Sequence, residues 1–475
     1  MKDNSRFFSS LGLLIVLNAV VKPLWIFGID RQVQVHVGAA EYGTYFSIFN
    51  LSIVLSFMLD WGLTNFFNRR LSVSRDNFER DAGSLIFLRL LAAIMYSGVI
   101  VLIAWFSGIT RWSIVAYVIL IQVFTSLFVF FRAIITSQQW FHTDAWLSVL
   151  DKLLMIILCG SFLYLPAFSP DFTIEVFLLI QLSCTLLANI VTLAILFRRR
   201  FFFSFRKLWP AKEVFLTAFP FAMILLLMSF HSRIDGFLLE RLSGAEEAGK
   251  YAASYRLLDA ANTVGYLFAS FLLPFIAKSW SEKQDISNVT LSVRHILLLM
   301  AITASATTYF LAPWLQELLY HHSDPDYILV MQWCLPALFG YSLVQVYGTI
   351  LTATGRVQAF CLIMLIAVMI NLVLNLILIP THGAVGSCIA ALASQVFAGI
   401  VTMLFVTKKL SLPLDPRSWF IYMIISIALV AFLYFATGNM NNWMLLVCTA
   451  ILSLGLGLLT KIIRIHTWKI SIKAD

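Results

Sequence analysis

The sequence predicts an all-α polytopic membrane protein with about 14 transmembrane helices. The 475 residues are 60% hydrophobic and only 12% charged, and the mean hydropathy is +0.89. A soluble domain of average composition carries about twice that share of charged residues. Many apolar runs also reach the roughly 20 residues that a helix needs to cross about 30 Å of hydrocarbon. Runs such as MILLLMSF are apolar on nearly every face, whereas the strands of a membrane β-barrel alternate in polarity.

The apolar runs divide the chain into fourteen predicted spans. The first six are 9–30, 42–62, 84–107, 112–136, 147–167 and 173–197. The next six are 213–235, 250–275, 292–318, 327–353, 357–379 and 384–407, and a final pair covers 418–437 and 443–463. Because the number of spans is even, both termini are expected on the same side of the membrane.

The basic residues predict which side that is. Most of the 33 lysines and arginines fall in segments that face the cytoplasm if the N-terminus is inside, including the cluster RRRFFFSFRKLWPAK at 198–212. Short loops rich in Lys and Arg stay in the cytoplasm. We therefore expect cytoplasmic N and C termini. The same bias explains the net charge of +9, so the charge does not call for a nucleic-acid partner.

Two polar octets reveal an internal repeat. GAAEYGTY (38–45) and GAEEAGKY (244–251) share the pattern G-A-x-E-x-G-x-Y, and each follows an Ile-Asp pair, at 29–30 and at 234–235. One octet precedes span two and the other precedes span eight. A shift of six spans preserves orientation, so the repeat predicts two parallel six-helix lobes. Within each octet the glycines are expected to make the turn, Glu to start the helix, and Tyr to lie at the membrane interface.

The repeat sets the predicted domain boundaries. Residues 1–200 form the N-terminal six-helix lobe, and residues 201–412 form the C-terminal lobe with the basic cytoplasmic linker at its start. Residues 413–475 supply two extra helices and a basic tail. Paired lobes around a central cavity are how many transporters alternate access between the two sides of a membrane.

Four stretches of the chain carry a resemblance to a known family. They are RIDGFLLERLSGAEEAGKYAASYRLLD at 233–259, EYGTYFSIFNLSIVLSFMLDWGLTNFFNRRLS at 41–72, LTATGRVQAF at 351–360 and NLVLNLILIPTHGAVGSCIAALASQ at 371–395. With these stretches the chain resembles Wzx-type polysaccharide and O-antigen flippases, which belong to the multidrug/oligosaccharidyl-lipid/polysaccharide exporter superfamily. The resemblance is weakest in the last two spans.

The resemblance implies a function and its partners. A protein of this family moves an undecaprenyl-diphosphate-linked oligosaccharide from the inner to the outer leaflet of the bacterial cytoplasmic membrane, by alternating access, for surface polysaccharide export. Its expected partners are the lipid-linked glycan, membrane lipids and other polysaccharide-assembly membrane proteins. A multidrug or lipid II exporter of the same superfamily is the alternative. A glycan polymerase or acyltransferase is a further alternative, which is disfavoured because the longest internal connection, 63–83, is short.

Ionisable side chains at membrane depth are the candidate substrate-binding residues, because each is costly in hydrocarbon. Lys22 stands beside a proline in span one and faces either a cavity or the outer interface. Arg256 and Asp259 lie on one face of span eight, where they either neutralise each other or present the arginine to the cavity. With Arg31 and Arg233 near outer helix ends, they would form a cationic patch for a diphosphate, which the guanidinium fork suits.

Other charged residues lie close to helix ends. Asp60, Arg89, Arg132, Asp151 and Lys152 are all within reach of an interface. We expect these side chains to snorkel towards the headgroups.

A coupling cation, Na⁺ or H⁺, is the only cofactor that we expect. Asp235 together with Asn371 and Asn375, one turn apart on span eleven, would supply hard oxygen ligands. Hydrogen bonding between helices is the alternative role of the two asparagines.

The sequence predicts no enzyme activity. It contains no nucleophile paired with a base, no pair of catalytic carboxylates and no glycine-rich phosphate loop. The six cysteines fall within or beside spans, at no metal-ligand or disulfide spacing, so we interpret them as packing residues. We therefore expect no catalytic residues and no metal site.

Overall fold

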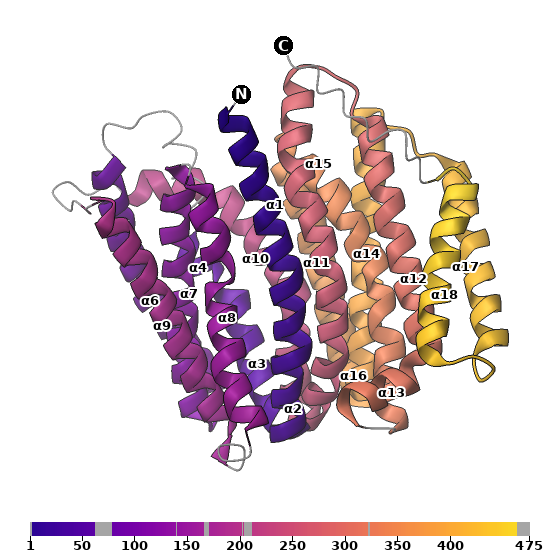
Figure 1. Cartoon of the computed structure of the whole chain (residues 1–475), viewed down its shortest axis with the longest axis horizontal. Helices are drawn as coiled ribbons and strands as arrows, with labels where there is room; N and C mark the ends of the chain where they lie inside the picture. The colour runs from indigo at the N-terminus through magenta and orange to yellow at the C-terminus, as the bar shows by residue number, and fades with distance from the viewer. Residues whose placement is uncertain are drawn as a thin grey trace. The chain divides into compact units, whose positions relative to one another are not determined.

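The computed structural model describes residues 2–61, 78–138, 140–165, 171–201, 203, 211–321 and 324–462. These residues are nearly all helical, and no strand occurs among them (Figure 1). Most of the predicted basic linker, at 202 and 204–210, and the basic tail from 463 onward lie outside the described residues. The all-α prediction is confirmed.

The chain forms two compact units, Met1–Gly249 and Lys250–Asp475. Unit 1 contains α1 (Lys2–Pro23), η1 (Leu24–Asp30), α2 (Arg31–Val37), α3 (Ala39–Leu55), α4 (Phe57–Asp60), α6 (Phe78–Phe106), α7 (Trp112–Ser137), α8 (Phe141–Tyr164), α9 (Ile174–Arg198) and α10 (Ala211–Ser243). Helix α11 (Ala245–Ser281) starts in unit 1 and continues into unit 2. Unit 2 also contains α12 (Ser287–Tyr320), α13 (Pro325–Cys334), η3 (Leu335–Ala337), α14 (Leu338–Leu343), η4 (Val344–Gly348), α15 (Thr349–Ala353), α16 (Val357–Leu410), α17 (Pro416–Ala436) and α18 (Asn442–Leu459).

The compact units do not divide where the predicted lobes do. The boundary between units falls inside the second octet, after Gly249, because α10 packs along α3 in unit 1. The predicted lobes describe repeats rather than compact units, so their boundaries at 200 and 412 stay a prediction. The cytoplasmic location of both termini also stays a prediction.

Thirteen helices among the described residues are long and apolar enough to cross a membrane. One of them, Val357–Leu410, holds two spans, because the backbone turns at Gly383 (φ 53°, ψ −132°) shortly after Pro380. Two contacts show the reversal. A Cβ on Gly386 would lie 2.7 Å from the carbonyl carbon of Leu378, and Asn371 donates a hydrogen bond to Ser394 over 3.3 Å. With this helix counted as two, fourteen helices among the described residues are long and apolar enough to cross a membrane, which is the predicted number of spans.

The first span has a wider backbone turn at its predicted outer half. Helix α1 ends at Pro23, and the next seven residues, Leu24–Asp30, form a π-helix before α2 begins. Proline has no N–H to donate and clashes with the preceding turn, which favours a local change of helix type. The side chain of Lys22 is exposed at this junction.

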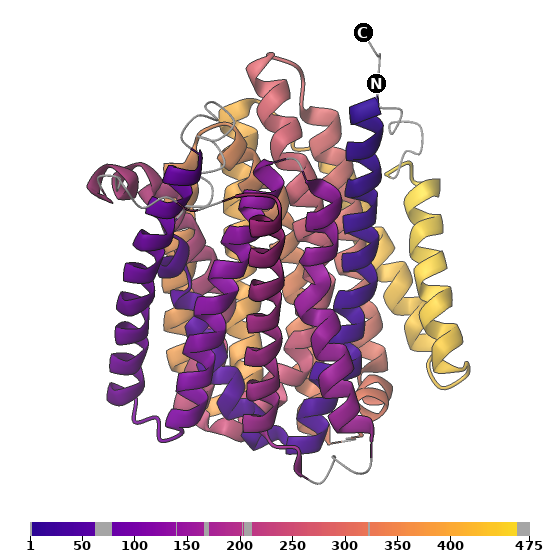
Figure 2. The same cartoon turned by 60° about the vertical axis from the view of Figure 1, so that its left-hand side comes forward.

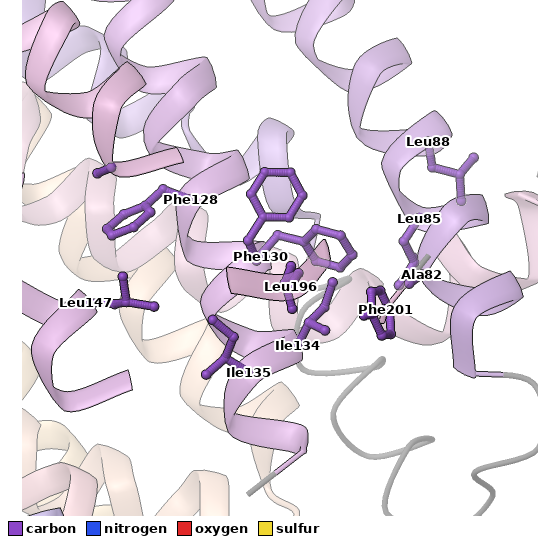
Figure 3. Close-up of a cluster of buried hydrophobic side chains, with 12 residues drawn as sticks. Ala82, Leu85, Leu88, Phe128, Phe130, Ile134, Ile135, Leu147, Leu196 and Phe201 are labelled. Atoms are coloured by element: carbon purple, nitrogen blue, oxygen red, sulfur yellow. The ribbon is translucent and has the colours of Figure 1, made fainter. Parts of the chain in front are cut away.

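A cluster of buried side chains holds α6, α7, α8 and α9 together in unit 1. Phe128, Phe130 and Ile134 of α7 pack with Leu85 of α6 and Leu196 of α9 (Figure 3). Lipid-facing side chains of the same helices stay exposed, as with Ile94 of α6. In a membrane protein, packing of this kind and interhelical hydrogen bonds replace the hydrophobic drive that water supplies.

Two arginines that we expected to snorkel are bound inside unit 1. Arg89 has 2% of its side chain exposed; it pairs with Asp60 and donates to the hydroxyl of Ser126 over 2.8 Å, with its guanidinium 4.8 Å from the centre of the Phe130 ring. Arg132 donates to both carboxylate oxygens of Asp144, at 2.8 and 3.1 Å. For Arg89 the snorkelling prediction is wrong, because a carboxylate and a hydroxyl compensate the charge within the bundle.

Helix α12 organises unit 2. It packs against α13, α14, α17 and α18, and the last two form the yellow hairpin in Figures 1 and 2. Leu299 of α12 packs with Ile425 and Leu429 of α17, and the hydroxyls of Thr303 and Ser453 lie 2.5 Å apart between α12 and α18. The two extra helices are thus fixed to unit 2 by both apolar and polar contacts.

Removal of the Arg89 guanidinium should destabilise unit 1. We expect Arg89→Met to lower the free energy of unfolding by about 3–5 kcal/mol, since it leaves the Asp60 carboxylate without its partner in a partly buried site. The measurement is thermal unfolding of the purified protein in detergent. The double variant Arg89→Met with Asp60→Asn should recover much of the loss, and equal midpoints for the wild type and the single variant would contradict this role.

Candidate functional site

The two octets meet in unit 1 through a reciprocal contact of their backbones. A Cβ on Gly43 of the first octet would lie 2.7 Å from the amide nitrogen of Gly249 and would overlap the Ala245 carbonyl. A Cβ on Gly249 of the second octet would lie 2.7 Å from the carbonyl carbon of Ala39. The sixth residue of each octet thus faces the second residue of the other. We call these four residues the octet clasp.

The turns that bring the octets together depend on their first glycines. Gly38 (φ 85°) precedes α3 and Gly244 (φ 96°) precedes α11, a conformation that residues with a Cβ rarely adopt. The glycines therefore make the expected turns, and Glu41 stands in the first turn of α3. Tyr45 and Tyr251 are both buried within the protein, and their expected depth at the membrane interface stays a prediction. Tyr45, for example, packs edge-on against a phenylalanine of α9, Phe177.

Helices α3 and α10 also approach each other closely beyond the clasp, further along both helices. A Cβ on Gly236 of α10 would lie 2.7 Å from the Phe46 ring and 2.8 Å from the Asn50 side chain of α3. The hydroxyl of Ser47 donates to the carboxylate of Glu240 over 3.2 Å. Gln34, which is 4% exposed, donates its side-chain amide to the Gly249 carbonyl over 2.8 Å. Small residues allow this approach, and the polar contacts hold its register.

Two arginines of unit 1 form ion pairs in or beside the segments that carry the octets. Arg111, at the start of α7, pairs with Glu41 of α3 and lies 3.5 Å from Glu175 of α9. Arg241 of α10 pairs with Glu240 and donates to the Ser107 carbonyl over 2.6 Å. Exposed pairs such as Arg111 with Glu41 contribute little to stability, so their main effect is on orientation.

The predicted substrate residues of unit 1 differ in their exposure and in their hydrogen bonds. Lys22 is exposed on α1, and Arg31 donates to the Phe27 carbonyl over 3.0 Å and to the side chain of Gln32 over 2.7 Å. Arg31 is therefore held by its own helical segment. Arg233 is half-buried on α10.

In unit 2, Arg256 is held by neighbours that sequence reasoning did not identify. It is 6% exposed and donates to the Tyr320 hydroxyl over 3.3 Å, and that hydroxyl donates to the Ala253 carbonyl over 3.0 Å. Asp259, one turn further along α11, is half-buried. Tyr320, the last residue of α12, lies 64 residues from Arg256 in the sequence, so no local spacing rule could have linked the two.

The two asparagines of the predicted cation site form hydrogen bonds with each other. Asn375 donates to the side-chain oxygen of Asn371 over 3.1 Å and to its carbonyl over 3.0 Å, and Asn371 donates to Ser394. Both are fully buried in unit 2, whereas Asp235 is buried in unit 1. The bond from Asn371 to Ser394 joins the two halves of α16, as in the alternative role, whereas these two bonds of Asn375 lie within one helix. A cation site that includes Asp235 stays a prediction.

No group of three or more His, Cys, Asp or Glu side chains suited to a metal ion occurs among the described residues. The six cysteines form no disulfide, and four of them are buried. That burial agrees with their interpretation as packing residues.

Comparisons with known proteins identify the family and the fold of the chain. Residues 32–280, more than half of the chain, match the model of a family described as polysaccharide biosynthesis protein. No curated protein matches the chain. The solved structure of a lipid II flippase, MurJ, in an inward closed conformation is similar with a TM-score of 0.75 at 13% identity, covering 94% of this chain and 98% of that chain.

Multidrug transporters share the fold as well. An inward-facing transporter of the MATE family and MOP superfamily gives a TM-score of 0.65 at 16% identity, covering 84% of this chain and 94% of that chain. A MATE structure in a bent conformation gives a TM-score of 0.61 at 16% identity, covering 86% and 96%. At the level of fold, the prediction of an all-α multi-pass membrane protein is confirmed.

A methyl group in the clasp should separate the two octets. We expect Gly43→Ala and Gly249→Ala each to lower the free energy of unfolding by about 1–3 kcal/mol, because the added Cβ meets backbone that cannot move aside. Gly98→Ala is the matched control: a Cβ there meets nothing within 4 Å, so it should be neutral or stabilise α6 by roughly 0.5–1 kcal/mol. Thermal unfolding in detergent compares the three. Midpoints for the clasp variants as high as that of Gly98→Ala would contradict the close contact.

Proposed function

The chain belongs to the polysaccharide biosynthesis protein family, and on this premise we propose that it is a flippase for a lipid-linked glycan. Its substrate is an undecaprenyl-diphosphate-linked oligosaccharide, moved from the inner to the outer leaflet of the bacterial cytoplasmic membrane for surface polysaccharide export. The family match over residues 32–280 is the observation that carries the proposal. The Wzx type, and O-antigen as the exported polymer, are part of the proposal.

The fold comparisons support a lipid-linked substrate over a small drug. The lipid II flippase structure matches over 94% of this chain, whereas the inward-facing multidrug transporter matches over 84%. A lipid II exporter is therefore the second candidate function. It shares the polyprenyl diphosphate with the first candidate, so the two differ only in the glycan that the cavity accepts.

The physical task explains why such a substrate needs a protein. A hydroxyl-covered glycan and a charged diphosphate lose their hydration in hydrocarbon, at a large cost in free energy. A hydrated groove between two lobes removes that cost while the prenyl tail stays in lipid. Outward movement of an anion from a negative cytoplasm also gains about 2.3 kcal/mol per charge per 100 mV.

The octet clasp supplies a place at which the predicted outer side would open and close. Helix α3 belongs to the predicted N-terminal lobe, and α10 and the start of α11 belong to the predicted C-terminal lobe. At the clasp their contact is made by glycine and alanine backbones, and opening would also break the side-chain contacts of Phe46 and Ser47 with α10. In this proposal the clasp is closed while the substrate site is open to the cytoplasm.

Arg256 is the proposed anchor of the diphosphate. Tyr320 holds its guanidinium, which reduces the side-chain entropy lost when a ligand binds. Lys22, Arg31, Arg233 and Asp259 complete the proposed substrate site. Asp235, Asn371 and Asn375 remain the proposed site of a coupling cation, Na⁺ or H⁺.

Loss of the protein should leave the lipid-linked glycan on the cytoplasmic leaflet. The measurement is leaflet-resolved labelling of the intermediate in a deletion strain that has no redundant flippase. Accumulation on the inner leaflet, restored by the wild-type chain, is the expected result. Normal appearance of the glycan on the outer leaflet would refute the proposed function.

Neutralisation of the proposed anchor should slow transport without affecting insertion. We expect Arg256→Ala and Lys22→Ala to reduce transport by about tenfold each, since a lost charge-assisted contact costs about 1.5–3 kcal/mol. The control is Lys408→Ala, which removes an exposed charge from the end of α16. Transport is measured with the same labelling and normalised to the amount of membrane-inserted protein. If Arg256→Ala transports as well as Lys408→Ala, Arg256 has a structural role only.

A further inference from the structure

Unit 2 contains a cavity of about 270 Å³ at the ends of α12, α17 and α18. Helices α12 and α17 begin at this cavity and α18 ends there. The predicted orientation places these ends at the cytoplasmic interface. The cavity is therefore expected at the depth of lipid headgroups in the inner leaflet. None of the residues proposed to bind the transported substrate lines it.

The charges around the cavity favour an anionic ligand. Two exposed basic residues, Arg417 and Lys461, line it, together with one acidic residue, Asp415. The Asp415 carboxylate lies 3.5 Å from the guanidinium of Arg294 and 3.9 Å from the ring of His295. Because Arg294 compensates Asp415, the two lining basic residues give the cavity a net positive charge.

A buried arginine fixes the shape of the cavity. Arg294 has a fully buried side chain and donates to the Ser418 hydroxyl over 2.6 Å and to the Leu414 carbonyl over 3.2 Å. Beside it, a ring nitrogen of His295 lies 2.5 Å from the Tyr422 hydroxyl. These bonds hold the start of α17 against α12. The lining is therefore set before any ligand binds.

Further groups of the lining suit a phosphate. Asn288 lies in the first turn of α12 and Ser418 in the first turn of α17, and both line the cavity. The positive ends of these two long helices thus point to the same space as Arg417 and Lys461. Helix N-termini and basic side chains together stabilise phosphate groups.

Apolar residues of the lining and of the same helix ends suit a ligand that has acyl chains. Ile421 and Ile462 are among the lining residues. Phe420, beside Ile421 on α17, is 60% exposed, and Leu459, at the end of α18, is 80% exposed. A soluble phosphate would use only the polar half of this surface. A phospholipid would place its phosphate in the cavity and its chains along α17 and α18.

We propose that this cavity binds the phosphate of an anionic glycerophospholipid of the inner leaflet. The ligand is a resident membrane lipid, distinct from the transported glycan, and the proposal does not depend on the function proposed above. Arg417 and Lys461 bind the phosphate, and the exposed apolar side chains of α17 and α18 contact the acyl chains. Bound lipid would fasten the C-terminal hairpin to α12.

The test is lipid retention by the full-length protein, measured by native mass spectrometry. Delipidated protein is offered phosphatidylglycerol or phosphatidylcholine with identical acyl chains. We expect phosphatidylglycerol to be retained about tenfold better, as clustered basic residues at a headgroup favour anionic lipids. Equal retention of the two lipids would overturn the proposal.

Two double variants locate the binding. Arg417→Gln with Lys461→Gln should abolish the preference for phosphatidylglycerol, whereas Lys408→Gln with Lys409→Gln, the same change of charge outside the cavity, should preserve it. All four side chains are exposed, so both variants should unfold at the wild-type temperature. A preference that survives in the first variant, or is lost equally in the second, would contradict binding in the cavity.

Two competitors identify the source of the phosphate. Inorganic phosphate at millimolar concentration should not displace phosphatidylglycerol; displacement would show a site for a soluble anion. Undecaprenyl phosphate should bind no better than phosphatidylglycerol. Stronger binding that is lost in Arg417→Gln with Lys461→Gln would assign the cavity to the transported lipid and overturn the proposal of a resident one.

Discussion

The close approach of two backbones at the octets is the contact on which this account of the protein depends. Gly43 and Gly249 each face the backbone of the other octet, at positions where a Cβ would overlap it. Between transmembrane helices, small residues permit dispersion contacts and polar contacts that larger side chains would prevent. The sixth residue of each octet contacts the second residue of the other. The repeat therefore has a physical explanation, because one sequence pattern can encode both halves of a self-complementary contact.

Compensation of charge within each unit is the second theme of the structure. Arg89 pairs with Asp60 and Arg132 with Asp144 in unit 1, and Arg294 lies close to Asp415 in unit 2. Each of these arginines lies beside an acidic residue of another segment. An ionisable group that is compensated in this way is tolerated among transmembrane helices. Such pairs contribute to packing, so a charge at membrane depth is not by itself evidence of a substrate site.

Hydropathy and loop signals predicted most of the fold. All fourteen helices of membrane-spanning length were predicted, including the reversal between 379 and 384, where Pro380 and Gly383 interrupt an otherwise continuous apolar run. The sequence did not predict the π-helical segment after Pro23, and it did not predict the burial of Arg89, which depends on which helices become neighbours. The octets were recognised as a repeat, but their mutual contact was not predicted, since a periodic pattern does not say which copies touch. Tyr320 was missed as the partner of Arg256 for the same reason.

The most direct test of the account is to lock the octet region and measure transport. Ser47 and Glu240, whose side-chain oxygens lie 3.2 Å apart, can be replaced by cysteines in a chain free of native cysteines and joined with a short, reducible thiol cross-linker. If α3 and α10 must separate for the outer side to open, glycan transport stops when the link forms and returns when it is reduced. Full transport by completely cross-linked protein would contradict the account.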